Sequence, residues 1–117
     1  MRSEGDKGEA AARSVLTRAG FSVLAQNFSV RGGEIDIVAR APDGCIVFVE
    51  VKLRAREPID HSSVVPRVKI LRMRRAAAQF LSEFGAPSRV RYDLILLIPN
   101  SVTRRARVVW YRDFTRL

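Results

Sequence analysis

The chain has 117 residues, of which 47% are hydrophobic, and its formal net charge is +9. This length fits one domain with a buried core, residues 1–117, and the composition excludes wholesale disorder. No apolar run approaches the roughly 18 residues that a membrane span needs, so we expect no membrane insertion. Residues 1–13 are charged and lack an apolar signal core, so a cytoplasmic protein is expected by default. The single cysteine, Cys45, excludes an internal disulfide and a cysteine zinc cluster, and we expect it to be buried.

The first predicted element is a helix over residues 4–19, which Gly20 ends. Three short strands follow at residues 21–30, 34–40 and 45–53. Glycine- and proline-containing turns separate them, so they should form an antiparallel meander.

A charged loop over residues 54–65 leads to a second helix, with Pro66 in its first turn. An apolar stripe along this helix ends at Phe84, and Gly85 and Pro87 end the helix. A fourth strand is predicted at residues 89–98 and a fifth, at an edge, at 107–111. The helix crossover should bring the fourth strand into the sheet. The fold class is therefore α/β, with a central mixed sheet of about five strands flanked by helices, in the order αβββαβ(β).

The candidate site comes from two of these strands. Glu34 and Asp36 share one face of the second strand, with Ile35 and Ile37 expected on the other, while Glu50 and Lys52 share a face of the third. If the two strands pair, Asp36 and Glu50 meet at one end of the sheet.

Paired carboxylates repel unless a cation neutralises them, and Mg²⁺ accepts one or two protein carboxylates while keeping several waters. The Val51 carbonyl could supply another oxygen, and Lys52 could neutralise a phosphate or orient a water. The alternative is the exposed face of an amphipathic strand, with Glu50 and Lys52 a weak surface pair. The apolar residues on both faces of the third strand favour burial, where charges are costly unless they pair or bind metal.

The charge is unevenly distributed along the chain. Residues 1–50 carry six basic and seven acidic side chains, whereas residues 51–117 carry fifteen and five. The basic second half predicts a polyanionic partner, with nucleic acid ahead of an anionic membrane surface. The basic residues that directly follow the site are the candidates for phosphate contacts, with a solvated face as the alternative: Arg54, Arg56, Arg67, Lys69, Arg72 and Arg75.

Asp36 followed by Glu50-Val51-Lys52 resembles the PD-(D/E)xK nuclease signature. With Gly8-Glu9, Gly33-Glu34-Ile35-Asp36, Phe48-Val49, Lys69, Ala76-Ala77 and Arg91-Tyr92-Asp93, nearly the whole chain is similar to the YraN-type family. This small bacterial family is related to archaeal Holliday-junction resolvases.

The resemblance implies a restriction-endonuclease-like fold and cleavage of DNA, branched or flapped forms included, with Mg²⁺ or alternatively Mn²⁺. It assigns Asp36 and Glu50 as metal ligands, Lys52 as the catalytic lysine and Glu9 as the first-helix glutamate that helps to hold metal or water. Ile35 replaces the proline of the signature, and the second-helix glutamine of the resolvases has no clear match. Resolvase-like action also suggests a homodimer, because symmetric cuts need two sites.

Two other classes of function remain open. The same fold could serve as a non-catalytic nucleic-acid-binding module without a metal requirement, or its basic face could bind an acidic protein. Outside the site, we expect His61 to be solvated, Trp110 to pack in the core or at an edge, and Asp93 to fix a strand end rather than bind metal.

Overall fold

The computed structural model describes residues 4–85, 87 and 89–115. In this part of the chain, two α-helices and five strands follow one another in the order α1–β1–β2–β3–α2–β4–β5, with a short 3₁₀ helix, η1, before α2. This order confirms the sequence-based prediction. The bounds are α1 Glu4–Arg18, β1 Ser22–Val30, β2 Gly33–Arg40, β3 Ile46–Leu53, η1 His61–Ser63, α2 Arg67–Phe84, β4 Val90–Pro99 and β5 Ala106–Tyr111.

The strands form a single mixed sheet in the order β1-β2-β3-β4-β5. Neighbouring strands are antiparallel except β3 and β4, which run parallel because α2 carries the chain back across the sheet. The predicted meander, the crossover and the position of β5 at an edge are therefore all confirmed. They give the α/β arrangement expected from the element order, a mixed five-stranded sheet flanked by helices.

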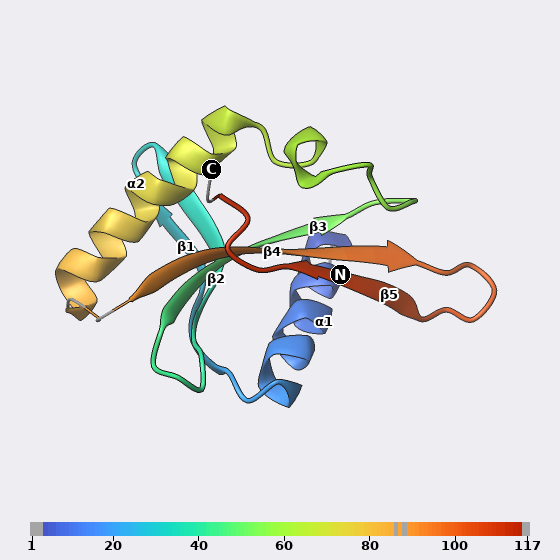
Figure 1. Cartoon of the computed structure of the whole chain (residues 1–117), viewed down its shortest axis with the longest axis horizontal. Helices are drawn as coiled ribbons and strands as arrows, with labels where there is room; N and C mark the ends of the chain where they lie inside the picture. The colour runs from blue at the N-terminus through green and yellow to red at the C-terminus, as the bar shows by residue number, and fades with distance from the viewer. Residues whose placement is uncertain (1–3, 86, 88, 116–117) are drawn as a thin grey trace.

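The two helices cover opposite faces of the sheet (Figure 1). On one face Ala12 and Leu16 of α1 pack on inward residues of β2, β3 and β4. On the other face Met73 and Phe80 of α2 are buried in two adjoining clusters that include Phe48 of β3. Strands β3 and β4 lie between both layers, which explains why their sequences are apolar on both faces. No helix among the described residues is long and apolar enough to cross a membrane.

The ends of α2 follow from local sequence. Pro66 is the N-cap rather than a residue of the first turn, and Gly85 ends the helix with its N–H donating to the Leu81 carbonyl at 2.9 Å. The predicted apolar stripe holds for Met73 and Phe80. Phe84, in the last turn, is the exception and remains 43% exposed.

Gly33, the first residue of β2, brings the sheet into contact with the backbone of α2. A Cβ atom at this position would lie 2.9 Å from the Ala76 nitrogen and closer still to the Arg72 carbonyl oxygen. Backbone atoms cannot move aside as a flexible side chain can, so only glycine permits this approach. The contact fixes the first half of α2 over the start of β2.

Candidate active site

Strands β2 and β3 separate at Asp36 and Glu50. Their pairing runs from Arg40 and Ile46 only as far as Ile37 and Val49. Beyond that point β2 stays with β1 and β3 stays with β4, so the sheet opens into a fork. At the fork, Asp36 Oδ2 accepts a hydrogen bond of 2.8 Å from the Val51 N–H. The Asp36 side chain thus takes the place of the next backbone partner and keeps its carboxylate beside β3.

The fork also interrupts the side-chain alternation of β2. Ile37 packs in the cluster on the α1 side, whereas Ile35 packs in the cluster on the α2 side. The prediction that both isoleucines share one face was therefore wrong. Opposite Asp36, Asn27 of β1 adopts a left-handed backbone conformation with φ 51°, which asparagine tolerates better than most residues. The change of side coincides with this local break in regular strand geometry.

Glu50 is the buried acid of the site. Its side chain is only 2% exposed, and its Oε2 atom has no hydrogen-bond partner among the described residues. Burial, with a hydrogen bond and charge repulsion from Asp36, raises the pKa of Glu50 to about 8, while Lys69 and Lys52 oppose this shift. The expected meeting of the two carboxylates is therefore present in the structure.

Lys69, in the first turn of α2, reaches the site from the face of the sheet that α2 covers. Its Nζ donates to Glu34 Oε1 at 2.9 Å and lies 3.5 Å from Glu50 Oε2, an ion-pair distance too long for a good hydrogen bond. Burial lowers the pKa of Lys69, but the hydrogen bond that it donates to Glu34 and the charge of Glu50 outweigh this effect, and the net shift is upward. The hydrogen bond from Lys69 in turn lowers the pKa of Glu34. Lys69, predicted to contact phosphate, thus directs its ammonium group at two carboxylates.

Lys52 lies on the same side as Glu50, two residues further along β3, and its side chain is half-buried. Its charge lowers the pKa of both Glu50 and Glu34, so the ammonium lies within electrostatic reach of both. The three groups predicted to converge at one end of the sheet therefore lie together, and their chemistry remains a prediction.

Glu9 lies on α1 at the same end of the sheet. Its neighbour Gly8 packs against Leu53, the residue after Lys52, so this turn of α1 covers the end of β3. The Glu9 side chain is partly buried. The structure places it on the opposite face of the sheet from Lys69, and its predicted role in holding metal or water stays a prediction.

The oxygen atoms at the site suit a magnesium ion that takes only a few protein ligands. Among the described residues no three His, Cys, Asp or Glu side chains gather as a metal-binding group. Two carboxylates do gather, and the Oε2 atom of the buried Glu50 lacks a hydrogen-bond donor. Mg²⁺ is satisfied by one or two protein carboxylates and waters, so Asp36, Glu50 and the Val51 carbonyl match its needs.

Comparison with known proteins identifies the family. Residues 8–97 match the model of the uncharacterised protein family UPF0102. The chain belongs to this family. A UPF0102 protein of Burkholderia cenocepacia is 40% identical over 111 residues, which cover 92% of this chain and 72% of the relative. A UPF0102 protein of Methylibium petroleiphilum is 40% identical over 103 residues, covering 82% and 84% of the two chains. The predicted YraN-type membership is thus confirmed.

One solved structure is also similar to this UPF0102 chain. It is a repair endonuclease from Pyrococcus abyssi, which matches with a TM-score of 0.48 and 21% sequence identity. The match covers 86% of this chain but only 41% of that enzyme. This chain therefore spans less than half the length of the enzyme it resembles.

The UPF0102 match contains every residue predicted to act in the site or on phosphate. Of the six basic candidates, all but Lys69 are exposed. Arg72 Nη2 lies 3.9 Å from Glu34 Oε1, and Arg75 Nη1 donates to the Gly32 carbonyl at 3.4 Å, so both also tie α2 to β2. Arg54 and Arg56 begin the loop that leaves β3 directly after Lys52.

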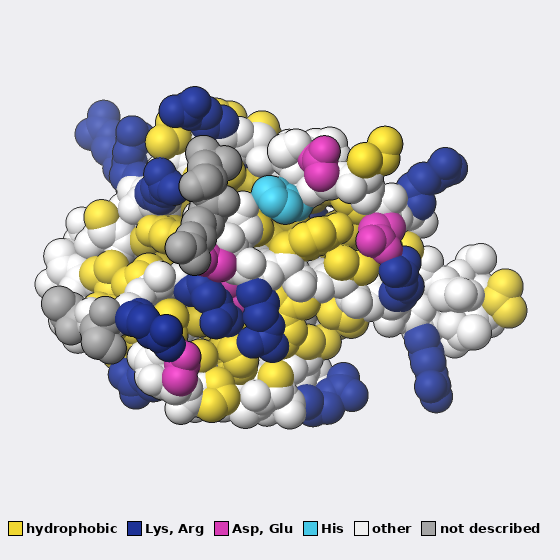
Figure 2. Space-filling view, viewed as in Figure 1, with side chains coloured by type: hydrophobic (Ala, Val, Ile, Leu, Met, Phe, Trp, Pro, Cys, Tyr) yellow, Lys and Arg dark blue, Asp and Glu magenta, His cyan; other side chains and the backbone are white. Residues whose placement is uncertain are grey.

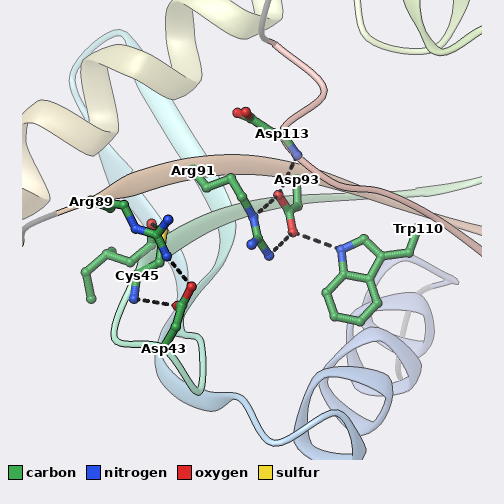
Figure 3. Close-up of polar contacts among 8 residues, drawn as sticks. Asp43, Cys45, Arg89, Arg91, Asp93, Trp110 and Asp113 are labelled. Carbon is green, nitrogen blue, oxygen red and sulfur yellow. Dashed lines mark hydrogen bonds and ion pairs between the residues drawn. The ribbon is translucent and has the colours of Figure 1, made fainter.

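A second polar cluster, around Asp93 of β4, lies on the opposite face of the sheet, the side that α1 covers, and is structural (Figure 3). The buried Asp93 carboxylate accepts two bonds from Arg91, one from the Trp110 indole N–H and one from the Asp113 backbone N–H, each 2.9 Å long. The expectation that Asp93 fixes a strand end is confirmed, as is the packing of Trp110. Cys45 is buried, as predicted.

Two features of the structure were missed from sequence. His61 is not a solvated loop residue, because its ring packs edge-on against Tyr111 and Phe114 at 5.7 and 5.6 Å. Lys69 was assigned to phosphate binding, although its place three residues after the N-cap Pro66 could have indicated a position at the end of the sheet where α2 begins. Its two carboxylate partners depend on how α2 is seated, which no sequence spacing gives.

Proposed function

We propose that the chain is a divalent-metal-dependent nuclease that hydrolyses phosphodiester bonds in DNA, including branched or flapped forms. The observation that carries the proposal is the buried Glu50 carboxylate beside Asp36, with one oxygen that lacks a hydrogen-bond partner in the described part of the chain. Lys69 Nζ lies 3.5 Å from that atom, an ion-pair distance that leaves the oxygen without a hydrogen bond, and buried polar groups left unsatisfied are costly. A bound cation would satisfy this oxygen, which explains why the chain keeps an arrangement that is costly in its absence.

The residues divide the chemistry among them. Asp36 and Glu50, with the Val51 carbonyl, would hold Mg²⁺ or Mn²⁺, which when bound would supply charge stabilisation at the phosphate and activation of a water molecule. Asp36 keeps its position through the Val51 N–H. Lys52, next on the same face, would place its ammonium against the developing negative charge of the scissile phosphate or orient the attacking water. Lys69 holds Glu34 and faces Glu50, so it sets the charge balance of the site before substrate arrives.

The test is cleavage of duplex, flapped and four-way DNA and of RNA, with Mg²⁺, with Mn²⁺ and with EDTA. Asp36→Asn and Glu50→Gln should each abolish metal-dependent cleavage. Asp43→Asn is the matched control, because Asp43 is an exposed carboxylate at the opposite end of the sheet. Cleavage that survives both site substitutions, or none by the wild type on any substrate, would refute the proposal.

One observation favours a second function, a non-catalytic nucleic-acid-binding module. Lys69 already supplies a positive charge to Glu34 and Glu50, so the carboxylates have a partial counter-ion within the chain. Calorimetric titration with Mn²⁺ separates the two functions. Binding that is lost in Asp36→Asn favours the nuclease, whereas DNA binding without any carboxylate-dependent metal binding favours the module.

A further inference from the structure

The hairpin formed by β4 and β5 projects from the body of the domain (Figure 1). It extends from the same end of the sheet as the candidate site, because β4 runs parallel to β3 and Glu50 pairs in register with Leu94. From Leu94 to Asn100, six residues of extended chain span about 20 Å, the length of about six base pairs of duplex DNA. The hairpin can therefore reach a nucleic acid several base pairs away from a phosphate bound at Glu50.

The turn of the hairpin is well defined rather than loose. Asn100 Oδ1 accepts bonds from the backbone N–H groups of Val102 and Thr103 at 2.9 and 3.0 Å. The Asn100 backbone also pairs with Arg104 and Arg105, at 2.8 and 2.9 Å. These bonds close the turn and hold Arg104 in a left-handed conformation with φ 60°. The arginines are thus presented from a preorganised turn, which reduces the entropic cost of binding.

The charge of the hairpin is positive and largely uncompensated. Residues 99–112 contain no acidic residue. Arg107 is paired with Glu57, but Arg104 and Arg105 are exposed and have no acidic partner among the described side chains. Lys and Arg side chains flank the projecting hairpin, and its mostly uncharged tip carries one hydrophobic patch (Figure 2). The hydrophobic residue is Val102, which is 89% exposed.

Two hollows lie beside the base of the hairpin. One, of about 390 Å³, lies between the end of β3 and the hairpin and is lined by Leu53, Arg54, Ala55, Pro99 and Ser101. The other, of about 580 Å³, lies between α1 and β5 and includes Arg18 and Arg105. None of the described residues that line either hollow is acidic. A surface that combines arginines, shallow hollows and an apolar tip matches nucleic acid, whose backbone is uniformly anionic.

We propose that the β4–β5 hairpin is a nucleic-acid-binding arm. It holds the phosphate backbone several base pairs from the site through Arg104 and Arg105, while Arg54 contacts the backbone nearer to Lys52. The inference rests on the proposed function in one respect, since the bound polymer is the substrate of the same site. It adds a surface outside the basic face of α2 and predicts a footprint that extends beyond the scissile bond.

The experiment measures DNA binding by fluorescence anisotropy in EDTA, which separates binding from cleavage. The arm variant is Arg104→Asn with Arg105→Gln, because asparagine accepts the left-handed conformation at position 104 while removing the charge. The control variant is Arg40→Gln with Arg89→Gln, which removes two exposed charges at the opposite end of the sheet. Thermal unfolding of both variants verifies that they fold.

The arm variant should bind a duplex of about 20 base pairs more weakly than the control does. Its slope of log K against log salt should be smaller by about two, since each lost phosphate contact removes about 0.9. If the arm variant shows the same slope and affinity as the control variant, the proposed arm is refuted. It is also refuted if the wild type binds no DNA. If the wild type binds through the arm but never cleaves, the proposed nuclease function fails and the arm stands.

Discussion

Replacing Glu50 by glutamine tests how strongly the burial of this carboxylate at the fork lowers the stability of the fold. Burial and Asp36 raise the pKa of Glu50 from its ordinary value of 4.5 to about 8. Between these values the unfolded chain has lost a proton that the folded chain retains. The contribution of Glu50 to the free energy of unfolding is therefore fully present below about pH 4.5, and it is lost as the pH rises through about 8. Glutamine has nearly the same shape and no charge at any pH, so Glu50→Gln should be free of this loss.

The size of the effect follows from the same two values. At about 1.4 kcal/mol per pH unit, the interval from 4.5 to about 8 sets a ceiling of about 5 kcal/mol above pH 8. Solvent screens little of this electrostatic effect, because the Glu50 side chain is only 2% exposed. A difference of this size is a large share of the total stability of a small domain, commonly about 5–15 kcal/mol.

The assay is urea unfolding at about pH 5 and about pH 9, in EDTA, for the wild type, Glu50→Gln and the control Glu83→Gln. Glu83 is an exposed glutamate near the end of α2, so the control makes the same chemical change on the surface. The site variant should come within about 1 kcal/mol of the wild type near pH 5 and exceed it by several kcal/mol near pH 9. If the two differ by the same amount at both pH values, Glu50 is not destabilised by its charge and the reasoning is wrong.

Three further predictions concern single side chains. Lys69→Met should raise the affinity for Mn²⁺ measured by calorimetry, because a competing positive charge next to Glu50 is removed, whereas the more exposed Arg72→Met should change it little. Asp36→Ala should cost about 1–3 kcal/mol in urea unfolding, since it leaves the Val51 N–H without its acceptor, and Asp36→Asn should cost less. Asp93→Asn should cost about 3–5 kcal/mol, because it weakens a buried ion pair, and should leave metal binding unchanged.

Sequence reasoning predicted the elements and their order because the signals are local. Hydrophobic periodicity, glycine and proline positions, and the length of the crossover were enough to place the five strands. It also brought Asp36, Glu50 and Lys52 together, since that requires only strand alternation and one hairpin turn. It failed where the outcome depends on tertiary contacts. The positions of Ile35 and Lys69 follow from the fork in the sheet and from the seating of α2, which involve residues far apart in the chain.

Because of the close contact at Gly33, the side chains of the site reach their arrangement only when α2 has docked on the sheet. Because α2 rests directly on the backbone of this glycine, Lys69 reaches Glu34 and Glu50 only when the helix is fully docked. A nascent or partly unfolded chain therefore carries the acidic residues without their arrangement. Any reactivity toward phosphodiesters would then arise late in folding, as a property of the finished domain.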